Sequence, residues 1–132
     1  MDVDSNQFES LVAEEFAKIP TKYKEKLHNV AILIEVEPSI SVRQQEGLQE
    51  AETLLGFYQG IPLTERGAGY GVGLTLPDTI TLYIGPILLE ARQTHREVRQ
   101  IIRETLWHEV GHYFGLTEDM VDLREKDGTN RF

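Results

Sequence analysis

The segment from about residue 94 to residue 114 restricts most strongly how this chain can fold. Side chains suited to a core recur in it every three or four positions, and the resulting stripe consists of Val98, Ile101, Ile102, Thr105 and Leu106. This spacing predicts one long helix, from about Thr94 to Phe114, with a face that packs against the rest of the protein. Gly115 follows directly and predicts that the helix ends in a left-handed turn.

Three polar side chains continue this stripe at the end of the expected helix, namely His108, Glu109 and His112. Burying them without partners would cost a few kcal/mol, about 2–7 for one polar group, and a bound ligand would offset that cost. The histidines are one turn apart, about 6 Å along the axis, so their rings can converge on one ion. Glu109 can then point at a water on the ion, as in the HExxH arrangement. The segment therefore predicts a metal site.

A catalytic zinc site needs a third protein ligand and leaves a fourth position for water. The chain contains no cysteine, so imidazole and carboxylate groups are the ligands available. A left-handed Gly115 would turn the chain back toward the ion, and the next acids are Glu118 and Asp119. Glu118 is favoured because it stands six residues after the second histidine, with Asp119 as the alternative. Asp122 and Glu125 lie farther along, on an expected last helix with a short return path.

The rest of the sequence predicts helices that flank a small sheet of about three strands. A first helix, capped by Asp4 or Ser5, ends before Pro20. The other expected elements are short helices at 23–27, 86–91 and 117–125, a polar segment compatible with a helix at 46–55, and strands at 30–37, 54–63 and 79–85. The last strand alternates threonine or tyrosine with isoleucine or leucine, which predicts one buried and one exposed face. Met120 is expected to pack in the core.

The composition disfavours several classes of partner. A net charge of −9 argues against nucleic acid or an anionic membrane, because both attract clustered lysine and arginine. No run of about 18 apolar residues could span a bilayer, and the first ten residues lack the features of a signal peptide. We therefore expect a soluble, cytoplasmic protein with no nucleic-acid or membrane partner.

Three stretches of the sequence resemble a known family, and they read LLGFYQGIPLTERG, LPDTITLYIGPILLEA and VRQIIRETLWHEVGHYFGLTEDM. Together they resemble the small bacterial zincin-like metallopeptidases, single-domain proteins that carry HExxHxxGxxD. The resemblance implies an α+β fold with a small mixed sheet of about three strands packed against a long active-site helix. It also implies one domain that spans residues 1–132.

The same resemblance implies the roles of the site residues. It gives His108, His112 and the acid at 118 as ligands of Zn²⁺, and Glu109 as the general base. Glu118 stands where aspartate is common in the family and Asp119 follows at once, so the choice between these two acids stays open.

The main function hypothesis is zinc-dependent hydrolysis of a peptide bond in a peptide or protein substrate. Glu109 would take a proton from the attacking water, and an edge strand at Thr79 to Tyr83 would pair with the extended substrate. The loop at 67–73 would form a flap that brings Tyr70 to the developing oxyanion. The alternative is a non-catalytic, zinc-stabilised module that binds a peptide or protein without cutting it, since so short a chain has little material for specificity pockets.

Overall fold

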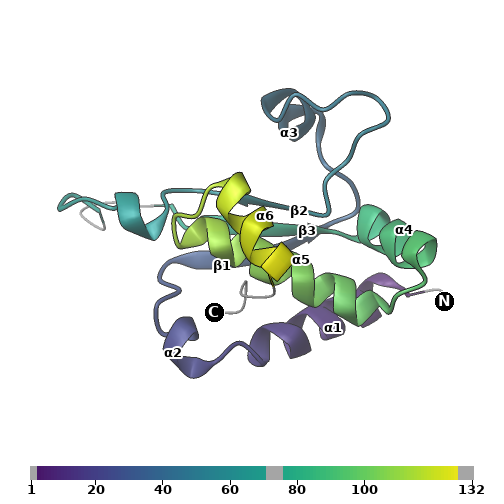
Figure 1. Cartoon of the computed structure of the whole chain (residues 1–132), viewed down its shortest axis with the longest axis horizontal. Helices are drawn as coiled ribbons and strands as arrows, with labels where there is room; N and C mark the ends of the chain where they lie inside the picture. The colour runs from purple at the N-terminus through teal and green to yellow at the C-terminus, as the bar shows by residue number, and fades with distance from the viewer. Residues whose placement is uncertain (1–2, 71–75, 128–132) are drawn as a thin grey trace.

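The computed structural model describes residues 3–70 and 76–127, and the structural statements below refer to these two ranges. In Figure 1, α5 runs beside a small sheet, α1 lies along α5, and α3 stands apart at the top. The elements in chain order are α1 (Ser5–Ala17), α2 (Thr21–Lys24), β1 (Val30–Glu35), α3 (Ile40–Gln45), β2 (Gly56–Gln59), the short 3₁₀ helix η1 (Leu63–Glu65), β3 (Asp78–Tyr83), α4 (Ile84–Thr94), α5 (Val98–Tyr113) and α6 (Glu118–Asp127).

The sheet is mixed and has the strand order β1-β3-β2. β1 pairs with β3 in parallel, with Val30 opposite Asp78, and β2 pairs with β3 antiparallel, with Gly56 opposite Leu82. The predicted α+β class with a three-stranded mixed sheet is therefore confirmed. The prediction that Thr79 to Tyr83 forms an edge strand is wrong, because β3 has a neighbour on each side. β2 is the edge strand that faces α5.

β3 is buried on both of its faces, contrary to the expected alternation. Ile80 and Leu82 point into the main core, and Thr81 and Tyr83 on the opposite face are 6% and 0% exposed. Threonine and tyrosine occur at both buried and exposed positions of strands, so the sequence pattern could not show whether this face is buried or exposed. Central strands commonly lose the alternation that edge strands keep.

The core forms where α5 packs on the sheet and on α1. The predicted stripe on α5 is confirmed, since Ile101, Ile102 and Leu106 are at most 1% exposed. Phe8 and Val12 of α1 bury against the same cluster. Each such side chain contributes roughly 1.5–3 kcal/mol through burial. This packing makes α5 a rigid support for the side chains on its last turns.

The predicted helix from Thr94 to Phe114 is wrong at its beginning. α4 ends at Thr94, where His95 adopts a left-handed backbone conformation with φ 54°, and α5 begins only at Val98. A histidine in this conformation is uncommon, and no glycine stands there to mark the break. The C-terminal end of the helix agrees with the prediction, because α5 ends at Tyr113 and Gly115 has φ +92°.

Two further expectations fail in the peripheral segments. The segment compatible with a helix at 46–55 contains none; a helix precedes it at α3, which Ser39 caps by accepting from the Val42 N–H. Met120 is 51% exposed, whereas its neighbour Val121 is buried, because successive residues of α6 point about 100° apart. None of the helices in the two described ranges has the length and apolar character needed to cross a membrane.

Candidate metal centre

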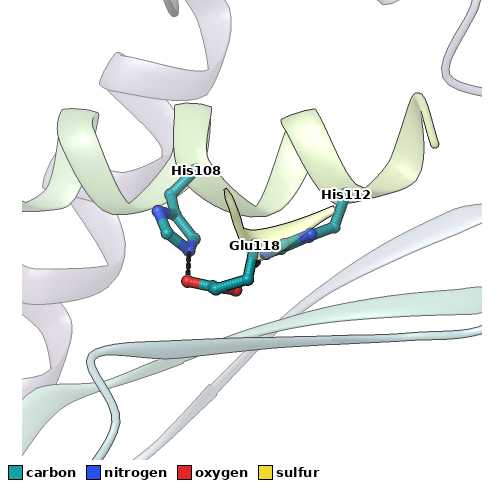
Figure 2. A group of neighbouring side chains, drawn as sticks. All are labelled: His108, His112 and Glu118. Atoms are coloured by element: carbon teal, nitrogen blue, oxygen red, sulfur yellow. Dashed lines mark ion pairs between the residues drawn. The ribbon is translucent and has the colours of Figure 1, made fainter. Parts of the chain in front are cut away.

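His108 and His112 project from the last turns of α5 toward the side chain of Glu118, at the start of α6 (Figure 2). Nε2 of His108 lies 2.9 Å from one carboxylate oxygen of Glu118, and Nε2 of His112 lies 2.8 Å from the other. These three side chains each offer a ligand atom, and the atoms lie within 4.8 Å of one another. Asp119 is exposed and belongs to no such group among the described residues.

Gly115 makes this approach of α6 possible. Its backbone has φ +92°, and a β-carbon there would lie 2.3 Å from Oγ1 of Thr64. The N–H of Gly115 donates to the His112 carbonyl and that of Leu116 donates to the Gly111 carbonyl, which closes the end of α5. The predicted left-handed terminator is confirmed. The turn brings Glu118 back over the two histidines.

The second ring nitrogen of each histidine also has a partner. Nδ1 of His108 lies 2.5 Å from a carboxylate oxygen of Glu125, and Nδ1 of His112 lies 2.9 Å from the carbonyl oxygen of Leu116. In the tautomer that donates from Nδ1, both rings present an unprotonated Nε2 toward Glu118. Glu125, a distant candidate ligand by sequence, thus contacts the back of the His108 ring.

Asp122 joins Glu125 and His108 in a second group of side chains whose ligand atoms lie within 4.8 Å of one another. The two groups share the ring of His108. Glu118 stands at its Nε2 atom and Glu125 at its Nδ1 atom. Burial lowers the pKa of His108, but the carboxylates of Glu109, Glu125 and Glu118 outweigh that effect and raise it.

Glu109 lies beside this group and is 6% exposed. Burial raises the pKa of its carboxyl group to about 7, while the nearby rings of His108 and His112 oppose the rise. The carboxylate also accepts a hydrogen bond from the main-chain N–H of Tyr58 in β2. A carboxyl group in this range can take up and give back a proton near neutral pH, which a general base must do.

The free edge of β2 faces Glu109. The Tyr83 N–H donates to the Leu55 carbonyl, so in antiparallel pairing the main-chain groups of Phe57 and Gln59 also point toward β3. Those of Gly56 and Tyr58 point the other way. The strand can approach α5 this closely because Gly56 lacks a β-carbon, which would lie 2.7 Å from Cγ2 of Thr105.

A cleft of about 850 Å³ opens over the two histidines and runs along β2. Glu46, at the end of α3, and Thr64 and Glu65 of η1 contribute to its walls. A smaller cavity of about 300 Å³ lies farther toward the beginning of α5, and Gly56, His108 and Glu109 line both spaces. The candidate metal ligands and Glu109 therefore stand in the middle of an elongated cleft.

A buried polar cluster anchors the far end of β2. Arg66 and Asp78 form an ion pair at 2.8 Å, with both side chains at most 6% exposed. The Tyr58 hydroxyl donates to Asp78 Oδ2 at 2.5 Å, the same oxygen that Arg66 contacts, and the Ile61 N–H donates to Oδ1. Sequence reasoning missed this cluster, because its members are far apart in the chain and only the pairing of β2 with β3 brings them together.

Tyr70 belongs to this anchored region and is not one of the residues that line the cleft. Its hydroxyl accepts from the Asn29 side chain, and the guanidinium of Arg66 stacks 4.2 Å from its ring centre. The structure therefore does not bring Tyr70 to the position expected for an oxyanion partner. Residues 71–73 of the expected flap lie outside the described residues.

Comparisons with known proteins identify the family of the chain. The family model described as zincin-like metallopeptidase matches residues 27–128. No curated protein matches the chain. A solved structure of a conserved hypothetical protein from Thermus thermophilus is similar in fold, with a TM-score of 0.54 and 23% identity over 95% of this chain and 98% of that one. The chain belongs to the zincin-like metallopeptidase family.

Proposed function

We propose that this protein is a zinc-dependent peptidase whose reaction centre consists of His108, His112, Glu118 and Glu109. The observation that carries the proposal is the position of Glu118, whose carboxylate faces the Nε2 atoms of both histidines beside the buried Glu109. Two imidazole nitrogens and one carboxylate oxygen are a usual ligand set of catalytic zinc. Membership of a metallopeptidase family supports the same reaction.

The groups that contact the Nδ1 atoms of the two histidines also fit a zinc site. Glu125 and the Leu116 carbonyl accept from the Nδ1 atoms, so they favour neutral rings with their Nε2 lone pairs toward the centre. Zinc held by these residues would supply Lewis acidity, which polarises a peptide carbonyl and lowers the pKa of a water molecule toward about 7.

Glu109 would act as the base and then as the acid. It would take a proton from the attacking water and deliver that proton to the amine nitrogen of the leaving peptide. The Tyr58 N–H holds the carboxylate in place, and its burial keeps bulk water from competing for the proton. The hydrolysis then consumes one water and releases a carboxylate and an amine.

The substrate would bind as an additional strand on β2. Its main chain would pair with the outward-pointing groups of Gly56 and Tyr58, the latter through its carbonyl. This replaces the expected pairing with Thr79 to Tyr83, whose main-chain groups are already paired within the sheet. Binding at β2 places the scissile bond next to Glu109.

The test uses the Glu109→Gln variant and a mixture of unstructured peptides. We expect the variant to retain the zinc content of the wild type, measured by elemental analysis after dialysis, and to lose peptide cleavage, measured by mass spectrometry. A drop of at least about 100-fold is expected on removal of a general base. Undiminished cleavage by the variant would contradict the mechanism. If the wild type holds peptides in a stable complex without cutting them, the non-catalytic binding module is correct instead.

A further inference from the structure

The walls of the cleft are strongly acidic, on both sides of the reaction centre. The glutamates that line the cleft and the adjoining cavity are Glu46, Glu65, Glu90, Glu104, Glu109, Glu118 and Glu125. Among the described residues that line these two spaces, Arg96 is the one lysine or arginine, and it is paired with Glu104 at 2.9 Å. The cleft therefore stays negative even with a doubly charged ion at its centre.

We propose that the substrate is a basic peptide segment, with lysine or arginine on both sides of the scissile bond. This inference rests on the proposed peptidase function and names the class of peptide that the cleft selects. A cleft with one sign of charge and low-dielectric walls concentrates ligands of the opposite sign. An acidic segment would meet uncompensated carboxylates along its whole length.

Metal binding does not account for most of these carboxylates. Glu118 and Glu125 belong to the groups of potential ligand atoms in the described part of the chain, whereas Glu46, Glu65 and Glu90 belong to none. Glu46 and Glu65 are exposed and form no ion pair within the described residues. Their charges are free to act on a ligand in the cleft.

The carboxylates are also placed where side chains of a bound strand would reach. Glu65 lies toward the Gln59 end of β2, and Glu90 and Glu125 line the cavity near Leu55, at its other end. β2 has four residues, which span roughly 13 Å at about 3.3 Å each. A strand paired with β2 therefore extends from one acidic end of the cleft to the other, and long cationic side chains can reach both.

The test uses two decapeptides with an uncharged fluorophore, one carrying four arginines and the other four glutamates at the same positions. Binding to zinc-loaded Glu109→Gln protein is followed by fluorescence anisotropy, and cleavage by the wild type is followed as kcat/KM. At low salt we expect at least roughly tenfold tighter binding and faster cleavage of the arginine peptide. The difference should shrink at about 0.3 M salt, because screening weakens interactions between exposed charges.

A matched pair of variants separates the cleft from the overall negative charge of the protein. Glu46→Gln with Glu65→Gln removes two charges from the cleft, and Glu9→Gln with Glu25→Gln removes two exposed charges elsewhere. The first pair should reduce the arginine preference at least roughly threefold, and the second should leave it unchanged. An equal effect of both pairs would overturn the proposal.

Different experimental results would contradict this inference and the proposed function. Equal binding and equal cleavage of the two peptides would overturn the basic-peptide proposal and leave the peptidase intact. Binding of the arginine peptide with a clear preference, but without any cleavage by the wild type, would contradict the peptidase and support the cleft's selectivity.

Discussion

Gly56 of β2 contacts Thr105 of α5 so closely that a β-carbon on the glycine would lie 2.7 Å from the threonine Cγ2 atom. The same β-carbon would lie 3.3 Å from Cγ of Glu109. The position of β2 relative to the proposed base therefore depends on the absence of one side chain. A strand held even slightly farther from α5 would also move the Tyr58 N–H away from Glu109.

Gly56→Ala should therefore damage both folding and catalysis. We expect a loss of about 1–3 kcal/mol in the free energy of unfolding, as for other overpacked sites, together with reduced cleavage. Urea unfolding and peptide cleavage assays measure the two effects. Thr105→Ser in the same background removes the nearest clashing atom, keeps the hydroxyl bonded to the Ile101 carbonyl, and should restore part of the stability. Gly67→Ala, where a β-carbon meets nothing within 4 Å, is the control.

Zinc affinity should distinguish the two candidate third ligands, because replacing the true ligand should weaken zinc binding and replacing the other acid should not. Glu118 faces both histidines and Asp119 is exposed outside the group. Glu118→Ala should weaken zinc binding by about 100-fold or more, because it removes a ligand, and Asp119→Ala should change it by less than about twofold. Competition with a zinc-chelating dye measures both. The reverse order would assign the third ligand to Asp119.

Glu125 should act through His108 and not as a ligand itself. Its carboxylate contacts the Nδ1 atom, on the side of the ring away from Glu118. Glu125→Gln keeps the shape of the side chain but weakens the acceptor, so zinc affinity should fall by about 10–100-fold, less than in Glu118→Ala. Zinc titrations of both variants give the comparison. If Glu125→Gln loses as much affinity as Glu118→Ala, Glu125 binds the ion directly.

The parts of the fold that the sequence predicts are those determined by neighbours along the chain. The stripe from Ile101 to Leu106, the histidine pair and the Gly115 turn all arise within one helix and its end, where periodicity and backbone preference act directly. The resemblance to the family rested on this region together with the stretches LLGFYQGIPLTERG and LPDTITLYIGPILLEA. The helices that flank a small sheet of about three strands followed from the order of such local segments, and the resemblance implied the α+β class.

The parts that the sequence did not predict depend on contacts between distant segments. Nothing local to β3 shows that it lies between β1 and β2, because strand order is decided by how the whole chain packs. The contact of Glu125 with His108 likewise requires the path of α6. α4 ends just before His95, where the sequence has no glycine or proline, so the sequence pattern did not indicate the break between α4 and α5.

A buried carboxylate on α1 makes the stability of the folded protein depend on pH in the acidic range. This dependence does not involve the metal centre. Glu15 is 2% exposed and forms ion pairs with Lys18 at 2.6 Å and with Arg99 of α5 at 2.8 Å. Burial alone would raise the pKa of Glu15, but the hydrogen bonds and charges of Lys18 and Arg99 outweigh burial and lower it below 4.5. The pair with Arg99 joins α1 to α5, the helix that carries His108 and His112.

The sign of the resulting pH dependence follows from this lowered pKa. The unfolded chain binds a proton at Glu15 more readily than the folded chain, so this contribution to stability is fully present above pH 4.5. It is lost as the pH falls from 4.5 through the folded-state pKa. Glu15→Gln removes the ionisation and leaves Arg99 with Glu14, 2.6 Å away. We expect the variant to lose about 1–3 kcal/mol at pH 7, as when a buried charged hydrogen bond is broken.

The measurement is urea unfolding of the wild type and Glu15→Gln at pH 7 and at pH 3, both with a chelator so that zinc release does not contribute. The difference in free energy between the two proteins should be largest at pH 7 and should narrow at pH 3, because the unfolded wild-type chain then binds a proton at Glu15. Glu9→Gln, an exposed position on the same helix, serves as the control and should show no such change. A difference that stays constant between the two pH values would mean that Glu15 stabilises α1 through its shape and not through its charge.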